Sequence, residues 1–401
     1  MQEPCVKGTG VGIERYPLIL FRRQELIDEW NKIDYISIQA GSLLWICGPP
    51  GTGKSCAALA FACSLNPSLW DVVWIHYSRD VEFNCVRMQK GVKQTCSFSE
   101  YDVETLLPQV LEPVSSLSRK TIVFLDGYVS DSDNAKRAYR VCNSWRTRDL
   151  DLRRLVCVSS MAVVGKECRL EGVAAIADTD EELLEKSLFD LFSWTLEDYL
   201  KYMSAIKNTE FFKTVQGKFP PYCPQPGIVE SEEVQRKKRL EEKYFVAGGS
   251  ARVMFEFSPK NAIQYVKRAL KAVPNFKICS DMLAGCAAST TINRLLAIYP
   301  VGDDDSESRL VSGYAMRALA IKLGPDVLKN MASLHGFNPS VDGYIFESWF
   351  FAMLTTCGVT WKRHVTDTDA SRPQWERSVV TFFDPTKLKL IMTSPKKWLA
   401  P

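Results

Sequence analysis

The chain carries the segment Gly48-Pro49-Pro50-Gly51-Thr52-Gly53-Lys54-Ser55, which fits the phosphate-loop pattern G-x-x-x-x-G-K-[ST] at every position. An apolar strand is expected before it at Ser42–Cys47, and a helix rich in small residues after it at Ser55–Ser64. The glycines let backbone N–H groups turn toward a phosphate, and the positive end of the helix points at the same anion. A plain Gly-Pro turn would not require Gly-Lys-Ser in this register. We therefore predict that this whole segment binds the phosphates of a nucleotide.

Three side chains supply the expected chemistry of this loop. Lys54 is expected to reach the β- and γ-phosphates, and the Ser55 hydroxyl to ligate Mg²⁺. The apolar strand expected at Thr121–Leu125 ends in Asp126, which is the Walker B pattern, and a carboxylate there faces the metal beside the loop. The sequence thus predicts Lys54 and Asp126 as catalytic groups and Ser55 and Asp126 as metal ligands, with a nucleoside triphosphate and Mg²⁺ as cofactors.

The group that activates the attacking water is left open. Gly127 follows Asp126, at a position where many nucleotide hydrolases carry an acidic residue. Asp131 or Asp133 could serve if the loop folds back, although Asp133 is equally suited to begin a helix. Without an acidic residue at position 127, we expect hydrolysis either to be slow or to use a base from another part of the protein.

Other polar side chains are candidates for contact with the γ-phosphate. Ser159 or Ser160, at the end of a further apolar strand, is either a sensor or an ordinary serine at a strand end. Arg252 follows two glycines, so it either swings onto a γ-phosphate or lies on the surface behind a turn. Arg146 and Arg148 are unranked candidates for an arginine finger.

The alternation of short apolar runs with helix-like segments predicts an α/β core, with a parallel sheet covered on both faces. The expected strands are Ser42–Cys47, Val72–Tyr77, Thr121–Leu125 and Arg154–Ser159, and the expected helices of this part are Ile19–Trp30, Ser55–Ser64 and Asp133–Thr147. Beyond it we expect helices at Asp180–Leu191, Leu196–Met203, Glu230–Lys243, Asn261–Val273, Asp281–Ala287 and Val311–Lys322, and an exposed acidic loop at Val301–Ser308. Three domains are therefore expected, over residues 1–180, 181–300 and 301–401.

Composition and charge exclude several classes of protein. Of the 401 residues, 46% are hydrophobic and 24% are charged, which excludes disordered, collagen-like and coiled-coil chains. The net charge of +3 implies neither a nucleic-acid nor a membrane partner, and the longest apolar runs are too short to span a bilayer. The 13 cysteines include no C-x-x-C pair, so free thiols in a reducing compartment are expected rather than a zinc site. No signal peptide is expected at the N-terminus.

Seven segments taken together carry a resemblance to a known family. They are Phe21–Leu26, Gly48–Ser55, Val73–His76, Leu125–Gly127, Val158–Met161, Ser193–Leu200 and Ala247–Phe255. In this order they resemble the Crinkler and retrotransposon hot spot (RHS) proteins, over roughly residues 15–401. The Ser-Trp-Thr-Leu and Gly-Gly-Ser-Ala-Arg segments are the most specific to that group.

The resemblance implies an AAA+/STAND-like P-loop NTPase core with a helical lid, followed by a nuclease domain of the restriction-endonuclease fold. It implies ATP as the nucleotide, Lys54 and Ser55 as Walker A, Asp126 as Walker B, and Arg252 as a catalytic arginine that faces the nucleotide. The Asp-Gly pair at Asp126 and Gly127 is similar to the pattern of the family. The chain contains no guanine-reading Asn-Lys-x-Asp motif, which agrees with ATP.

The nuclease-like α+β end is expected to be partial. Glu347 lies in Tyr344–Trp349, a segment similar to the first nuclease helix of the family, but the residues expected to complete the site would follow a Trp-Leu-x-Pro segment, here Trp398–Pro401. The remaining carboxylates of this region lie in polar loop or turn contexts, at Asp367, Asp369 and Asp384. Nuclease activity is therefore not expected.

Three functions follow from these observations. The first is a Mg²⁺-dependent ATPase that couples hydrolysis to movement of a helical lid at Asn261–Ile298. The second is a nucleotide-dependent switch or interaction module with little turnover, and the third is an ATP-regulated DNA nuclease effector. The partners considered are ATP, a second copy of the chain and nucleic acid. The basic clusters that could hold nucleic acid, although such clusters are usually solvated faces, are Arg236–Arg239, Lys362-Arg363 and Lys396-Lys397. The expected location is intracellular, the nucleus included, or a host cell for a secreted effector.

Overall fold

The computed structural model describes residues 6–12, 20–78, 81–112, 119–129, 132–159, 188–207, 209–222, 229–275, 292–302 and 305–323, with residues 350, 353, 359–360 and 374–375. Several residues considered above lie outside these ranges, namely Asp131, Ser160, Glu347, Asp367, Asp369, Asp384 and the basic pairs Lys362-Arg363 and Lys396-Lys397. So do the helix expected at Asp281–Ala287 and nearly all of the nuclease-like end, which stay predictions.

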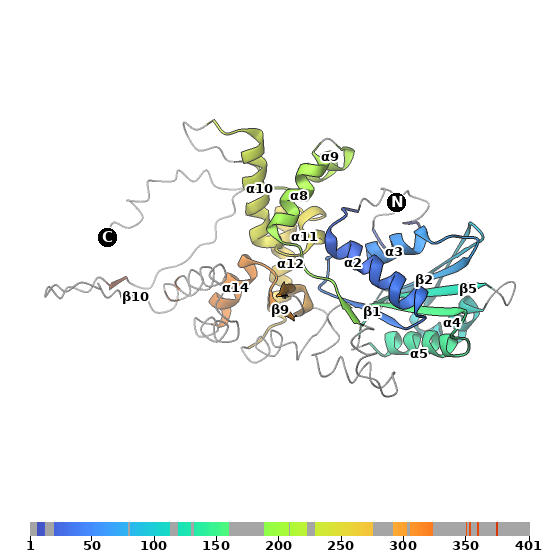
Figure 1. Cartoon of the computed structure of the whole chain (residues 1–401). Coiled ribbons are helices and arrows are strands. Elements are labelled where there is room, and N and C mark those ends of the chain that lie inside the picture. Colours follow the sequence, from blue (N-terminus) through green and yellow to red (C-terminus); the bar gives the residue numbers. More distant parts are fainter. Residues whose placement is uncertain are drawn as a thin grey trace.

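A seven-stranded, mostly parallel sheet forms the first part of the molecule (Figure 1). Its order is β4-β3-β2-β5-β6-β1-β7, and its strands are β1 (Leu44–Cys47), β2 (Trp70–Ser78), β3 (Glu82–Gln89), β4 (Val92–Ser99), β5 (Lys120–Tyr128), β6 (Arg153–Ser159) and β7 (Leu188–Asp190). The five strands from β2 to β7 in this order are parallel, whereas β3 and β4 form an antiparallel hairpin at one edge. The predicted α/β class is confirmed, and the antiparallel hairpin is an addition to it.

Helices cover both faces of this sheet. One face carries α2 (Gln24–Lys32) and α3 (Lys54–Ser64), and the other carries α4 (Val103–Leu111) and α5 (Asp133–Thr147) (Figure 1). The π-helix η1 (Ile33–Gln39) packs in the same core as α3, and the short helix η2 (Glu100–Asp102) directly precedes α4. Side chains alternate between the two cores along each strand, so that Leu44 and Ile46 pack with α3 while Trp45 packs with α5. Because the strands are buried on both faces, their sequences are continuously apolar.

The second part of the molecule is mainly helical. Its elements are α8 (Leu196–Ile206), α9 (Glu210–Gln216), α10 (Glu232–Ala247), α11 (Ala251–Phe255), α12 (Pro259–Lys271), η3 (Ile292–Leu295), β8 (Leu296–Val301), β9 (Asp305–Leu310) and α14 (Gly313–Leu323). Farther along, β10 (Val359–Thr360) pairs with β11 (Gln374–Trp375). Side-chain caps set several of these helix starts. At α8, for example, Thr195 and Asp198 form a capping box, and at α12 the hydroxyl of Ser258 accepts from the N–H of Asn261.

Two expectations for this part are wrong. The helix expected at Asp180–Leu191 is a strand in its described portion, because Leu188–Asp190 pairs with β1 and sheet pairing overrides the local helical pattern. The exposed loop expected at Val301–Ser308 is instead part of an antiparallel hairpin, in which Val301 pairs with Asp305. The domain boundary expected at residue 300 falls inside this hairpin, and one apolar cluster joins α12, β8 and α14 across it.

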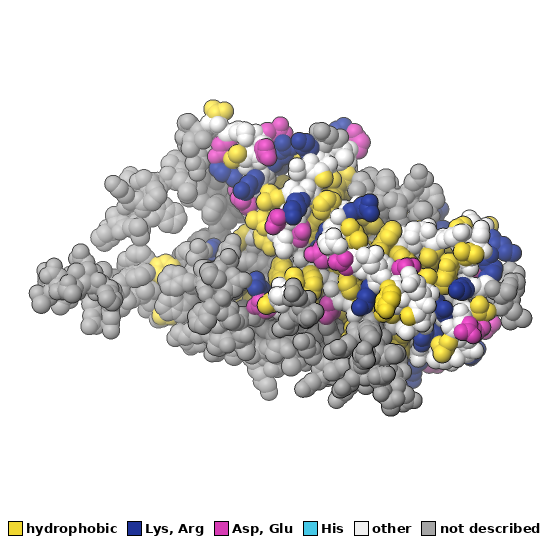
Figure 2. All heavy atoms as spheres, in the orientation of Figure 1, with side chains coloured by type: hydrophobic (Ala, Val, Ile, Leu, Met, Phe, Trp, Pro, Cys, Tyr) yellow, Lys and Arg dark blue, Asp and Glu magenta, His cyan; other side chains and the backbone are white. Residues whose placement is uncertain are grey.

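The basic cluster Arg236–Arg239 lies on a face of mixed charge. Figure 2 shows basic and acidic side chains interspersed over α10. Arg236 lies 4.0 Å from Glu232 and Lys237 lies 3.9 Å from Glu241, while Lys238 pairs with Glu230. Opposite charges at this spacing are typical of a solvated helix face rather than of a basic patch.

Lys243 is a buried basic side chain that joins three segments of the helical part. Its ammonium donates hydrogen bonds to the carbonyl oxygens of Lys218, Met254 and Phe257, and it lies 4.9 Å from the ring centre of Phe219. The side chain is thus the common partner of carbonyl groups that follow α9 and end α11. Burial lowers the pKa of Lys243 to about 7, and these acceptors replace the water that its charged form loses.

Replacing this ammonium tests its contribution to stability. Lys243→Met keeps the apolar stem and leaves three carbonyl groups without their donor, so we expect the free energy of unfolding to fall by about 3 kcal/mol. Urea unfolding followed by circular dichroism measures the change. The exposed Lys237→Met on the same helix is the matched control and should cost less than about 0.5 kcal/mol. Equal effects of the two substitutions would contradict this role of Lys243.

Candidate functional site

The predicted phosphate loop connects β1 to α3, and its backbone has the conformation that its glycines allow. Gly51 and Gly53 have φ angles of +85° and +109°, in the region that side chains disfavour. A Cβ at Gly51 would lie 2.3 Å from the Ser250 hydroxyl oxygen, so this glycine also permits a close approach of the helical part. The helix begins at Lys54, directly after Gly53, and its free N–H groups therefore face the loop.

Lys54 is buried and lies over its own loop. Its ammonium donates to the carbonyl oxygen of Pro49 at 3.1 Å, and the Thr52 hydroxyl donates to the same oxygen at 3.1 Å. Burial lowers the pKa of Lys54 to about 8, the Asp126 carboxylate acts in the opposite direction, and Arg252 adds to the lowering. An anion in the loop would favour the charged form of this lysine, since an opposite charge offsets the cost of burial.

Asp126 joins the loop to the sheet. Its carboxylate accepts a hydrogen bond from the Ser55 hydroxyl at 2.7 Å and a second one from Nδ1 of His76 at 2.7 Å. The two predicted metal ligands, Ser55 and Asp126, are therefore in direct contact although they come from α3 and β5. Asp126 is only 2% exposed, so these bonds form in a site that excludes most water.

His76 is a member of this site that the sequence analysis did not assign. It lies directly opposite Asp126 in the parallel pairing of β2 with β5. The signal available in the sequence is its place at the end of an apolar strand, since the carboxyl ends of neighbouring parallel strands share one edge of the sheet. Gly10 leaves room for the imidazole, because a Cβ there would lie 2.2 Å from Cδ2 of His76.

The oxygen atoms of Ser55 and Asp126 are ligands suited to a magnesium ion that also binds phosphate. Mg²⁺ prefers oxygen ligands and is usually held by one or two protein groups together with substrate phosphates and water. The Ser55 hydroxyl and the Asp126 carboxylate supply such a pair beside the loop. Within the described ranges, no group of three or more His, Cys, Asp or Glu side chains could hold a metal alone.

Gly127 is fixed by a close contact between strands. The pairing of β5 with β6 is irregular between Asp126 and Tyr128, and Gly127 has a φ angle of +85°. A Cβ at this position would lie 2.5 Å from the carbonyl oxygen of Tyr77 on β2. An acidic side chain directly after Asp126 is thus sterically excluded, which gives a physical reason for the glycine found there.

This contact can be tested by adding a single methyl group. Gly127→Ala should lower the free energy of unfolding by about 2 kcal/mol or more, because strain in φ and a backbone clash both act. Gly91→Ala is the matched control, since Gly91 has a φ of +78° but no atom within 4 Å of the added carbon. Thermal unfolding of both variants is compared, because Gly91→Ala introduces only the φ strain and Gly127→Ala adds the clash. Equal losses of stability in the two variants would show that the clash is absent.

The helical part holds the outer side of the phosphate loop. The indole N–H of Trp194 donates to the Thr52 carbonyl at 3.0 Å, the Ser250 hydroxyl donates to the Pro50 carbonyl at 3.2 Å, and the backbone N–H of Arg252 approaches the Gly51 carbonyl at 3.4 Å. The carbonyl groups of Pro50, Gly51 and Thr52 therefore all have hydrogen-bond partners in the helical part. These partners lie just before α8 and at the start of α11.

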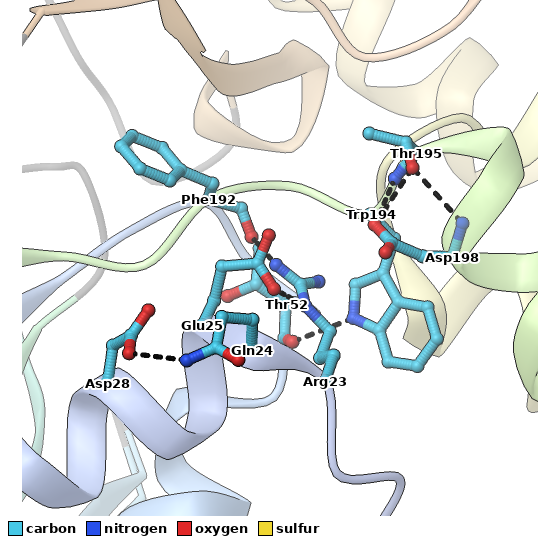
Figure 3. Close-up of polar contacts among 9 residues, drawn as sticks. All are labelled: Arg23, Gln24, Glu25, Asp28, Thr52, Phe192, Trp194, Thr195 and Asp198. Atoms are coloured by element: carbon cyan, nitrogen blue, oxygen red, sulfur yellow. Dashed lines mark hydrogen bonds and ion pairs between the residues drawn. The ribbon is translucent and has the colours of Figure 1, made fainter. Parts of the chain in front are cut away.

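Arg23, directly before α2, connects this helix to the segment around Trp194, as Figure 3 shows. Its guanidinium donates to the Phe192 carbonyl at 2.7 Å and to the Glu25 carboxylate at 2.8 Å, and it lies 5.1 Å from the ring centre of Trp194. Arg23 is only 3% exposed, so this stacking and these bonds form away from water. Neither Arg23 nor Trp194 was assigned a role from the sequence, although both lie in segments that carried the resemblance.

Glu29 is a fully buried carboxyl group on α2, beside the backbone of Ala58 in α3. Burial raises its pKa well above the usual value and Asp126 adds to this, while Lys54, Arg23 and the N–H of Ala58 oppose it. Neither carboxyl oxygen has a well-formed hydrogen bond in the described part of the chain. The protonated form is thus the one that this environment favours.

This raised pKa predicts a pH dependence of stability. The folded state keeps a proton on Glu29 that the unfolded chain releases above about pH 4.3, so this contribution to stability falls as pH rises toward the folded pKa. Glu29→Gln cannot titrate, and its melting temperature should exceed that of the wild type at pH 7.5 but not at pH 4. Thermal melts from pH 4 to 7.5 test this. The exposed Glu232→Gln is the control, and a parallel decline in Glu29→Gln would contradict the assignment.

The other predicted residues have the following places. Arg252 lies beside the loop, with its side chain half exposed and 3.9 Å from Glu256. The Ser159 hydroxyl donates to the Tyr128 carbonyl at 3.0 Å, within the sheet. Asp133 is the first residue of α5, whose N-cap is Ser132, and its side chain points to solvent.

The two arginine-finger candidates point elsewhere in this chain. Arg146 donates to the Gly41 carbonyl at 3.0 Å, and burial lowers its pKa. Arg148 is exposed and lies 4.0 Å from Glu112. Neither contacts the phosphate loop of the same molecule, and their use as fingers toward a second copy stays a prediction.

The chain is distantly similar to solved structures. No family model matches the chain, and no curated protein matches it. Among solved structures, it is similar to a chain in the structure of Drosophila ORC bound to DNA, with 11% identity over 94% of this chain and 90% of that one, and a TM-score of 0.34. A similarity this low does not bear on function, which is therefore inferred from the residues of the site alone. In the described part of the chain, no helix is both long and apolar enough to cross a membrane.

Proposed function

We propose that this chain is a P-loop ATPase that hydrolyses ATP with Mg²⁺. The observation that carries the proposal is the hydrogen bond of 2.7 Å between Ser55 and Asp126. It brings the last residue of a complete phosphate-loop pattern into contact with a carboxylate near the end of the buried strand β5. This is the arrangement in which a hydroxyl and a carboxylate hold Mg²⁺ beside the phosphates of a nucleotide.

Each residue of the loop has a part in the proposed site. Backbone N–H groups of Gly51–Ser55 and the start of α3 would bind phosphate oxygens, and Lys54 would turn from the Pro49 carbonyl to the β- and γ-phosphates. Mg²⁺, held by Ser55 and Asp126, would neutralise charge on the transferred phosphoryl group. Arg252 would face the nucleotide from α11, since its backbone already lies against Gly51.

We also propose that the chain is an AAA+/STAND-like member of the Crinkler and RHS group. One strand, β6, lies between the strand before the loop and the strand that bears Asp126, and this order is compatible with an AAA+ core. Four segments that carried the resemblance meet at the loop, through Arg23, Thr52, Trp194 and Ser250. Contacts among segments so distant in sequence support the view that they form one functional unit.

A nucleotide-dependent switch with little turnover is the second candidate. It is favoured by Gly127, because the contact with Tyr77 excludes the acidic residue that would activate water at this position. His76 is hydrogen-bonded to Asp126 and therefore already has a partner on one ring nitrogen. In this reading ATP binding changes the contacts of α8 and α11, and hydrolysis is slow.

The experiment is phosphate release by the purified chain with ATP and Mg²⁺, beside ATP binding measured by calorimetry. Lys54→Ala should reduce turnover by about 10²-fold or more, because it removes the charge that stabilises the phosphoryl transition state. Asp126→Ala should weaken the dependence on Mg²⁺. The exposed Lys136→Ala is the control for Lys54→Ala and should keep wild-type turnover.

The outcomes separate the two candidates. Turnover that is lost in Lys54→Ala and kept in Lys136→Ala establishes the ATPase. Binding that requires Lys54, without turnover, establishes the switch. If a folded wild-type chain neither binds nor hydrolyses ATP, both are wrong.

A further inference from the structure

Two cysteines face each other across the hairpin at the edge of the sheet. Cys85 on β3 lies directly opposite Cys96 on β4 in the antiparallel pairing. Residues opposite each other in such a pair have Cα atoms about 4.5–5.5 Å apart. A disulfide needs about 4.4–6.8 Å, so the backbone can accept one without a change of register.

Aromatic stacking fixes this register. Phe83 and Phe98 form the pair two positions away on the same face, and their ring centres are 5.5 Å apart. Phe83 also stacks on Tyr77 of β2, with ring centres 4.6 Å apart. A one-residue slip of β4 would move its side chains to the other face and break the stack. The two thiols are therefore held opposite each other by packing.

The two thiols have different surroundings. Cys85 is 1% exposed and belongs to the apolar core, whereas Cys96 is exposed at the edge strand. A hydrogen bond from the Cys85 thiol lowers the pKa of Cys96 to about 7, and the same bond together with burial raises the pKa of Cys85. Deprotonation near neutral pH therefore falls on the exposed sulfur, and the buried one keeps its proton.

Three other cysteines of the described ranges lack this combination, namely Cys56, Cys142 and Cys157. Burial raises the pKa of Cys56 to about 12, and it also raises the pKa of Cys142 and Cys157. A thiolate reacts and a thiol does not, so these residues are expected to be inert at pH 7. Cys96 combines exposure and a lowered pKa with a second sulfur within hydrogen-bond reach.

We propose that Cys85 and Cys96 form a site of reversible oxidation, in which a hydroperoxide converts the two thiols into a disulfide within the hairpin. The Cys96 thiolate attacks the peroxide, the O–O bond breaks, and Cys96 becomes a sulfenic acid while the leaving oxygen departs as water or an alcohol after protonation. The Cys85 sulfur then attacks the Cys96 sulfur, the S–O bond breaks, and water leaves. Two electrons pass from the two thiols to the peroxide.

This inference does not depend on nucleotide binding. Its structural consequence is a covalent link between the edge strand β4 and β3, which pairs with the strand that bears His76. Oxidation would prevent the edge strand β4 from separating from β3.

The test is treatment of the reduced full chain with hydrogen peroxide at pH 7 without nucleotide, followed by maleimide blocking, trypsin digestion and mass spectrometry. Trypsin can cut at Arg87, Lys90 and Lys93, so the two cysteines fall in separate peptides unless a disulfide joins them. We expect a linked pair two hydrogens lighter than its parts, released by dithiothreitol. Cys56 should be modified at least tenfold more slowly than Cys96.

Two variants make the result decisive. Cys85→Ser should leave Cys96 as a sulfenic acid that dimedone traps, and Cys96→Ser should leave Cys85 reduced. Circular dichroism and thermal melting show whether each variant chain still folds. Oxidation of Cys96 in the wild type to a sulfinic acid or to a disulfide between two chains, without the linked pair, would overturn the proposal. So would modification of Cys96 no faster than that of Cys56.

Discussion

The carboxylate of Asp126 is the point on which the arrangement of the site depends. It accepts from Ser55 on α3 and from His76 on β2, and so it binds the helix after the phosphate loop to two adjacent strands. The parallel pairing of β2 with β5 places His76 beside it, and burial strengthens both bonds because the local dielectric is low. Asp126 is thus the residue that connects the phosphate loop and its helix to the ends of the strands β2 and β5.

The phosphate loop is also shared between the two parts of the molecule. Its inner side faces Lys54 and the start of α3, whereas its outer carbonyl groups are bonded to Trp194, Ser250 and the backbone of Arg252. A change in the loop backbone alters these hydrogen bonds. The conformation of the loop and the positions of α8 and α11 are therefore energetically coupled. The proposed ATPase and the proposed switch would both use this link.

The parallel strands and the loop could be predicted from sequence because burial on both faces makes strands continuously apolar, and the loop has a fixed pattern. The hairpin of β3 and β4 was missed because its outer strand is largely exposed and polar. The strand at Leu188–Asp190 was mistaken for a helix, since only pairing with β1 decides its conformation. Arg23 and His76 were not assigned because their roles depend on contacts with residues far away in the chain.

The bond between Ser250 and Pro50 joins residues 200 positions apart, and this separation bears on how the chain is made. At about 5–20 residues per second, a ribosome needs about 10–40 s to extend a nascent chain from one partner to the other. During that interval the loop has emerged, but its outer carbonyl groups and the apolar surface around them still lack their cover. An apolar surface left uncovered during this interval is one that a chaperone or another nascent chain can bind.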